Sequence, residues 1–250
     1  MTKELKARIR TLRSTHKITA AMKIVAATAF NRLKCNTSSM FDFLESLIAV
    51  SSEIQNHMVE TNKRRLLIVV GGDRGLCGGY NAAIRKKTIQ YLKEFPEAEV
   101  AYIGTKIVLK ECKGVFTETV QHLRQWTVLM DKLQPIWQQY RFIDVVYTAF
   151  HTLYDQQITI ASIGNDGPGD DSMILNETDT DISAVIRTAA VMKAIIYAQL
   201  CEFSSRMLSM DNATQNAEKM IQDLSLAINK MRQAMITKEL AETVGCLINN

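Results

Sequence analysis

Toward the C-terminus, apolar side chains recur in alternating steps of four and three residues. This spacing is the 3.5-residue repeat of a left-handed coiled coil, and it predicts one long helix. The seam comprises Ile196, Leu200, Phe203, Met207, Met210, Thr214, Ala217, Ile221, Leu224, Ile228, Met231 and Met235. Because several of these residues are small or are flexible methionines, the seam should hold a partner helix less tightly than one of leucine and isoleucine.

The predicted C-terminal helix is too long to remain within a globular domain. From Ile182 to Val244 it would extend roughly 95 Å at about 1.5 Å per residue. A globular chain of this length has a radius of gyration of only roughly 18 Å, so we expect the helix to project. The N-terminal segment carries the same repeat more weakly, from Leu5 to Leu33, and poor helix formers at 36–39 would permit a local break.

A band within the N-terminal segment is apolar on every side of the predicted helix. Between Ile18 and Ala29, apolar residues occupy nearly every position. A helix that is apolar all round is normally buried all round, whereas one partner helix covers only a stripe. We therefore expect a further structure to surround the chain at this level.

The middle of the chain follows a different pattern. Ten of the eleven glycines and all three prolines lie between Gly71 and Gly169. Short apolar runs predict strands at 66–70, 100–103, 143–149 and 158–163, with helices directly after a glycine-rich turn and at 126–140. Strands that alternate with helices are typical of a small Rossmann-like α/β domain with a largely parallel sheet.

The two long helices should lie side by side and antiparallel, because both leave the same domain. The predicted fold class is therefore α/β with a long helical coiled coil: an antiparallel two-helix shaft with an inserted α/β domain. We predict the N-terminal coiled-coil helix at 1–60, the inserted domain at 61–176 and the C-terminal coiled-coil helix at 177–250. The C-terminal helix should run about ten residues further than its partner, so that the tip near 243–250 projects alone.

Composition and charge narrow the possible functions. No apolar run reaches the roughly 18 residues that a membrane span needs. Five cysteines without a CxxC pair and four scattered histidines predict neither a disulfide framework nor a metal site. Residues 1–34 carry nine Lys or Arg against one Glu, which would suit nucleic acid, an anionic membrane or an acidic protein sleeve. We favour the solvated face of a coiled coil; a retained organellar presequence is a further alternative.

The glycine-rich turn at 71–79 invites a nucleotide-binding interpretation, which fails in detail. The turn contains neither GxxxxGK[ST] nor GxGxxG, and Asp73 would repel a phosphate. We favour a structural turn that needs positive φ and close backbone approach, with Asp73, Arg74, Gly75, Gly78 and Gly79 as its defining residues. Cys77 as a nucleophile would need a histidine partner, so we predict no catalytic residue, no cofactor and no metal.

Three stretches, in order along the chain, resemble the γ subunit of F-type ATP synthases. They are KITAAMKIVAA at 17–27, DRGLCGG at 73–79, and a C-terminal set that includes SRM at 205–207, MDNAT at 210–214 and RQAMITKEL at 232–240. The resemblance implies a central rotor shaft that couples proton flow to ATP synthesis or hydrolysis without catalysing a reaction itself. It also implies a peripheral location on a bacterial inner membrane (cytoplasmic face) or a mitochondrial inner membrane (matrix face).

The same resemblance implies partners and contact residues. The shaft would thread the ring of α and β subunits, and the inserted domain would form a foot on the c-ring that binds the small ε-type subunit, called δ in mitochondria. Contacts to the ring would come from Met22, Lys23, Arg232, Gln233 and Thr237, and contacts at the foot from Glu177 and Asp179. Met22 could equally serve only to pack the coiled coil.

Two other classes of protein remain as alternatives. A coiled-coil scaffold with a globular hinge would have far longer arms and would lack the DRGLCGG turn. A basic helix that binds nucleic acid, attached to a small α/β enzyme, would bind nucleic acid in a salt-sensitive way. The rotor interpretation requires neither nucleic-acid binding nor a membrane span.

Overall fold

The computed structural model describes residues 2–51, 64–109, 112, 114–119, 125–137, 139–140, 142–163 and 178–248. The chain forms two compact units, which divide both long helices. We call residues 26–206 the α/β unit, and residues 1–25 with 207–250 the shaft unit. The domain boundaries predicted at 60/61 and 176/177 lie in stretches outside the described residues, so they stay a prediction.

The α/β unit contains a five-stranded sheet in the order β3-β2-β1-β4-β5. Its elements are β1 (Arg65–Val70), α2 (Tyr80–Glu94), β2 (Glu99–Ile103), β3 (Phe116–Glu118), α3 (Gln125–Trp137), β4 (Phe142–Phe150) and β5 (Gln156–Ser162). All neighbouring strands are parallel except β4 and β5, which are antiparallel. The largely parallel sheet and its four predicted strands are thus confirmed; β3, only three residues long, was not predicted.

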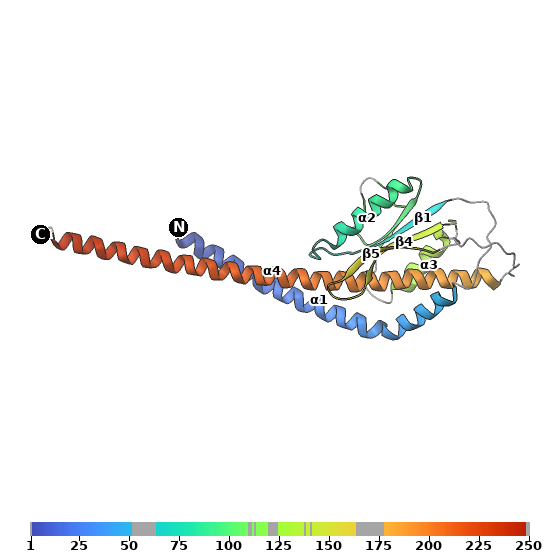
Figure 1. Ribbon diagram of the computed structural model, residues 1–250, viewed down its shortest axis with the longest axis horizontal. Coiled ribbons are helices and arrows are strands. Elements are labelled where there is room, and N and C mark those ends of the chain that lie inside the picture. Colours follow the sequence, from blue (N-terminus) through green and yellow to red (C-terminus); the bar gives the residue numbers. More distant parts are fainter. Residues whose placement is uncertain are drawn as a thin grey trace. The chain divides into compact units, whose positions relative to one another are not determined.

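The two faces of the sheet are covered by different helices, as Figure 1 shows for this unit. Leu66, Ile68 and Val70 of β1 join a core with residues of α1 (Thr2–Ser51), α3 and α4 (Thr178–Ile248). Leu67 and Val69 face the opposite way, into a second core with α2. Because alternate side chains of a strand point to opposite faces, a strand covered on both faces must be apolar throughout.

Asp144 is a charged side chain buried beside the sheet of this unit. Asp144 of β4 is 2% exposed and accepts hydrogen bonds from Arg65 Nη1 (2.5 Å), Ser162 Oγ (2.5 Å) and the hydroxyl of Tyr91. Burial, together with the hydrogen bond to Asp144, raises the pKa of Tyr91, so the phenol keeps its proton as a donor. These three donors offset the free-energy cost of burying the Asp144 carboxylate.

Helix α1 continues through residues 36–39, so the local break that these residues would permit does not occur. Thr37 is fully buried, and its hydroxyl donates to the carbonyl of Leu33 at 2.8 Å. Ser38 makes the same kind of bond to Cys35 at 3.4 Å. Both hydroxyls therefore donate to carbonyls of the preceding turn of α1. Because this bonding is compatible with the helix, the two residues do not interrupt it.

In the shaft unit, α1 and α4 are antiparallel, as predicted. Thr214 Oγ1 lies 2.8 Å from Thr19 Oγ1, and Lys23 Nζ lies 2.7 Å from Asp211 Oδ1. Extended along both helices, this register brings the start of α1 opposite about residue 231 of α4. Every described residue from 232 to 244 is exposed, so the unpaired part of α4 begins earlier than the predicted tip at 243–250.

The predicted coiled-coil seam divides between the two units. Met210 and Ala217 are buried in the shaft unit, and the seam positions from Ile221 to Met231 are partly buried, whereas Met235 is exposed. The first positions behave differently, because Ile196 and Leu200 belong to the core of the α/β unit. Their periodicity therefore reflects packing against the sheet as well as against α1.

Candidate functional site

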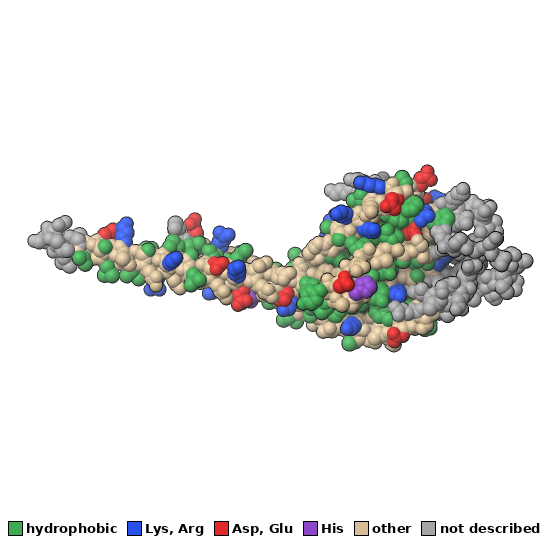
Figure 2. Space-filling model, in the orientation of Figure 1, with side chains coloured by type: hydrophobic (Ala, Val, Ile, Leu, Met, Phe, Trp, Pro, Cys, Tyr) green, Lys and Arg blue, Asp and Glu red, His purple; other side chains and the backbone are tan. Residues whose placement is uncertain are grey.

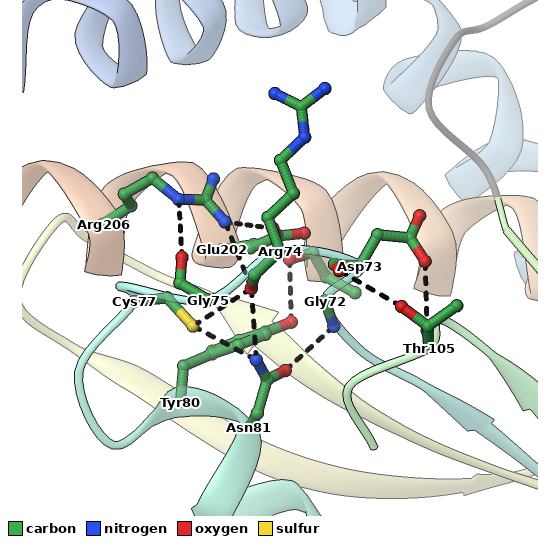
Figure 3. Close-up of polar contacts among 11 residues, drawn as sticks. Gly72, Asp73, Arg74, Gly75, Cys77, Tyr80, Asn81, Thr105, Glu202 and Arg206 are labelled. Carbon is green, nitrogen blue, oxygen red and sulfur yellow. Dashed lines mark hydrogen bonds and ion pairs between the residues drawn. The ribbon is translucent and has the colours of Figure 1, made fainter. Parts of the chain in front are cut away.

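The turn between β1 and α2 combines close backbone packing with left-handed residues (Figure 3). A Cβ at Gly71 would lie 2.4 Å from Ile107 Cγ2, and one at Gly72 would lie 3.0 Å from both Asn81 and Glu202. Gly78 has φ of 58° and Leu76 has φ of 63°, a region that favours glycine and is costly for leucine. At Gly75 and Gly79 an added Cβ would meet nothing within 4 Å, so crowding does not explain those glycines.

Asp73 holds a second loop in place. Its carboxylate accepts the backbone N–H of Thr105 at 3.0 Å, and its carbonyl accepts the Thr105 hydroxyl at 3.1 Å. The neighbouring Gly104 has φ of 119°, and a Cβ there would lie 2.5 Å from the carbonyl oxygen of Gly71. Asp73 therefore ties the end of β1 to the end of β2, which leaves its carboxylate unsuited to phosphate binding.

Two residues of α4, Glu202 and Arg206, bind this turn from the side (Figure 3). Arg206 donates from Nε to the Gly75 carbonyl at 3.2 Å and from Nη2 to the Arg74 carbonyl at 3.4 Å. It also forms an ion pair with Glu202, one helical turn earlier. Both side chains are buried, and burial raises the pKa of Glu202, an effect that Arg206 partly offsets.

The side chain of Arg74, in contrast, is exposed and extends away from the turn (Figure 3). Its carbonyl, not its guanidinium, takes part in the turn. The DRGLCGG motif points to Arg74, whereas no sequence pattern gives a role to Arg206 or Glu202 at this turn. The available signal was Arg206 within the SRM stretch, but the sequence does not place that stretch beside the turn.

Along the shaft unit, the residues predicted to contact a ring form two groups. Met22 and Lys23 are half-buried on α1, and Lys23 is already paired with Asp211. Arg232, Gln233 and Thr237 are exposed on the unpaired part of α4, where the Thr237 hydroxyl bonds back to the Gln233 carbonyl. The structure does not bring the two groups together.

The shaft unit also exposes large apolar side chains (Figure 2). On α1 these are Ile18, Ile24 and Val25, each at least 58% exposed, and on α4 they are Met220, Leu226, Met235, Ile236, Leu240 and Val244. The chain itself therefore covers only one side of the apolar band predicted at 18–29. Exposed apolar side chains in such number on a narrow rod indicate a protein-binding surface.

The two predicted foot residues, Glu177 and Asp179, fall around the start of α4. Glu177 lies outside the described residues. Asp179 is in the first turn of α4, but its side chain is not described. Residues 165–171, whose Gly, Asp and Asn content predicts a return loop, also lie outside the described residues.

Comparisons with known proteins agree over the whole chain. A family model described as ATP synthase matches residues 1–247. The ATP synthase gamma chain of a Psychrobacter species is 32% identical, with 97% of each chain covered. The chain belongs to the ATP synthase gamma chain family. The mitochondrial ATP synthase subunit gamma of Pichia angusta is 28% identical, with 97% of this chain and 96% of the relative covered.

Solved structures of low sequence identity share the fold. The rotor of the Euglena gracilis mitochondrial ATP synthase matches with a TM-score of 0.71 at 15% identity, covering 94% of this chain and 98% of that one. The central stalk of the Tetrahymena thermophila enzyme matches with a TM-score of 0.56 at 19% identity, covering 78% of this chain and 99% of that one.

In this member of the gamma chain family, the turn between β1 and α2 carries one thiol, that of Cys77. Cys77 is buried, and burial is the main cause that raises its thiol pKa. Its Sγ lies 3.2 Å from Asn81 Nδ2, with no histidine among the contacts that the structure describes. The described part of the chain contains no group of three metal-ligating side chains. Within it, no helix is long and apolar enough to cross a membrane.

These thiol environments predict selective alkylation. Burial raises the pKa of Cys77 and raises that of Cys201 to about 12, so neither is a thiolate at pH 8, whereas Cys35 is exposed. Iodoacetamide at pH 8 should therefore label Cys35 within the native chain and should label Cys77 and Cys201 only after urea is added, as peptide mass spectrometry would show. Labelling of native Cys77 as fast as Cys35 would contradict the assignment of Cys77 to a structural role.

Proposed function

We propose that this chain is the central-stalk rotor subunit of a proton-translocating ATP synthase. It transmits rotation of the c-ring to the catalytic β subunits and so couples proton flow to ATP synthesis or hydrolysis. The whole-chain match to the gamma chain family carries this proposal. A second observation supports it: the shaft unit presents an exposed, partly apolar helix that a partner must cover.

The shaft would act mechanically. A ring of α and β subunits around α1 and α4 would enclose Ile18, Ile24 and Val25, which the chain alone leaves exposed. A rod whose sides differ contacts each surrounding β subunit differently, and such differential contacts shift each subunit toward a different nucleotide affinity. The chain itself would then be a non-catalytic subunit, and the reaction would occur on its partners.

Within this proposal, the unpaired part of α4 contacts the catalytic subunits. Arg232 and Gln233 are exposed there and accessible to a partner; Thr237, whose hydroxyl is used within the helix, would add van der Waals contact. Met22 and Lys23 lie on α1, where Lys23 could exchange Asp211 for a partner carboxylate, because exposed ion pairs contribute little. The α/β unit would form the foot on the c-ring and bind the small ε-type subunit, with Glu177 and Asp179 near that contact.

The proposed location is peripheral, on an energy-transducing membrane of a bacterium or a mitochondrion, with attachment through the c-ring. A coiled-coil scaffold with a globular hinge is the alternative. It is disfavoured because α1 and α4 are paired over only part of their length, ending near residue 231 of α4. A scaffold would need the pairing to continue along its arms.

Purification from the native membrane in mild detergent tests the function. We expect this chain to co-purify with catalytic ATPase subunits at one copy per three, the ratio that a single shaft in a threefold ring requires. Quantitative mass spectrometry of the purified complex gives the ratio. Recovery as a free monomer, or bound to nucleic acid, would overturn the proposal.

A double substitution tests the contact residues. Arg232→Ala with Gln233→Ala should lower ATP hydrolysis and ATP-driven proton pumping by the assembled complex about tenfold, within the range of coupling energies of 1–3 kcal/mol. Glu218→Ala with Lys219→Ala is the matched control, because both residues are exposed on the same helix but lie outside the RQAMITKEL stretch. Unchanged hydrolysis and pumping in the Arg232 and Gln233 variant would show that these residues are not the contact.

A further inference from the structure

Three consecutive residues of α4 bond to the α/β unit at the point where the helix leaves it. Ser204 Oγ donates to the Leu153 carbonyl at 3.0 Å, and Ser205 Oγ lies 2.8 Å from Gln156 Oε1. Arg206 donates to the Gly75 carbonyl at 3.2 Å. Arg206 is also the last residue of this compact unit. We call Ser204, Ser205, Arg206 and the ion-paired Glu202 the collar.

The collar holds the helix from more than one side. Successive residues of an α-helix are turned by about 100°, so the side chains of Ser204 and Arg206 leave the helix roughly 200° apart. Ser204 and Ser205 reach the end of the β4–β5 hairpin, whereas Arg206 reaches the turn between β1 and α2 (Figure 3). Rotation of α4 about its own axis would therefore break contacts on both sides at once.

The turn that Arg206 binds is itself fixed to the sheet. Gly72 N–H donates to Asn81 Oδ1 at 3.0 Å, and Gly71 N–H donates to the Ile103 carbonyl at 2.9 Å. Tyr80, at the start of α2, donates its hydroxyl to the Ala198 carbonyl of α4 at 2.8 Å. A force on the Gly75 carbonyl thus passes into β1, β2 and α2 rather than bending a free loop.

Earlier parts of α4 contact the sheet mainly through apolar side chains. Ala194, Ile195 and Leu200 are fully buried in the core shared with the sheet. Apolar contacts are strong but non-directional, so they resist separation better than sliding or turning. Hydrogen bonds weaken steeply when their angle changes, and charge-assisted ones are stronger than neutral ones. The collar therefore adds a directional resistance to twist that the apolar contacts do not supply.

We propose that the collar is the torque lock of this chain: the contact that prevents α4 from twisting relative to the α/β unit when one of them is driven. Arg206 is the central positioning residue, and Glu202 holds its guanidinium toward the two carbonyls. The inference rests on the proposed rotor function, since only a driven shaft carries a sustained torque.

Torsional stiffness of the assembled complex tests this role. The catalytic subunits are immobilised, and a gold rod is attached to the α/β unit through Gln90→Cys on the exposed side of α2, in a Cys35→Ser background. The angular fluctuation of the rod is recorded without nucleotide. In Arg206→Met with Glu202→Gln we expect a wider angular distribution than in the wild-type complex, because the buried pair and both carbonyl contacts are lost.

The chain offers a matched control in a second ion pair of the α/β unit, in which Asp144 is buried. Arg65→Met with Asp144→Asn removes the pair between β1 and β4. The Asn oxygen accepts from one of the two hydroxyls of Tyr91 and Ser162, and its amide group donates to the other. This variant should lose thermal stability but keep the wild-type angular width, because neither residue contacts the collar. Arg206→Lys is a second test variant, since it keeps the charge opposite Glu202 but lacks the planar fork of donors with which Arg206 binds Glu202 and both carbonyls.

The outcomes separate the inference from the proposed function. Wild-type angular width in both Arg206 variants, or equal widening in the Arg65 control, would overturn the torque lock. If the Arg206→Met variant does not assemble, widening in Arg206→Lys supports the lock and its absence contradicts it. If the wild-type chain is not retained by the catalytic subunits at all, the rotor proposal itself fails.

Discussion

Helix α4 has to remain one unbroken helix while its surroundings change along its length. Its 71 residues run from the sheet of the α/β unit, through pairing with α1, to a stretch that is exposed at every described position from 232 to 244. At about 1.5 Å per residue it is roughly 105 Å long. The absence of glycine and proline along α4 before Gly245 is the local condition for this continuity, because either residue would weaken or kink it.

This constraint explains why the seam of α4 is mixed. A seam of leucine and isoleucine would favour one partner helix along the whole length. Here Ile196 and Leu200 pack on the sheet, Thr214 bonds to Thr19, and Met235 is exposed. Each stretch therefore carries the side chains that suit its own surroundings, and flexible methionines fit a surface that meets changing neighbours.

Much of the fold follows from local patterns in the sequence, whereas the site depends on contacts between distant residues. The strands of the sheet were predicted because a run such as Leu66–Val70 is apolar throughout, and the helices because their periodicity is long. β3 was missed because Phe-Thr-Glu is too short to show a pattern. The local break that residues 36–39 would permit does not occur, and residue propensity alone does not reveal that Thr37 bonds to its own helix.

The polar residues that hold the turn follow no sequence pattern comparable to the hydrophobic periodicity of the helices and strands. Arg206 binds a turn 131 residues earlier in the chain, and Asp144 binds Arg65 across neighbouring strands; no spacing rule pairs such positions. The sequence did indicate that the turn is structural, from the absence of phosphate-binding motifs. It could not indicate that α4 supplies the side chains which hold that turn.

Rotation is the most direct test of the account. The complex is fixed through its catalytic subunits, and a bead is attached to the exposed Cys35 of α1. On addition of ATP, we predict that the bead makes repeated full turns in one direction, advancing in steps. The rotation should stop when ATP is removed. A bead that only fluctuates about one position, in complexes that hydrolyse ATP at their normal rate, would contradict the claim that this chain is the rotor.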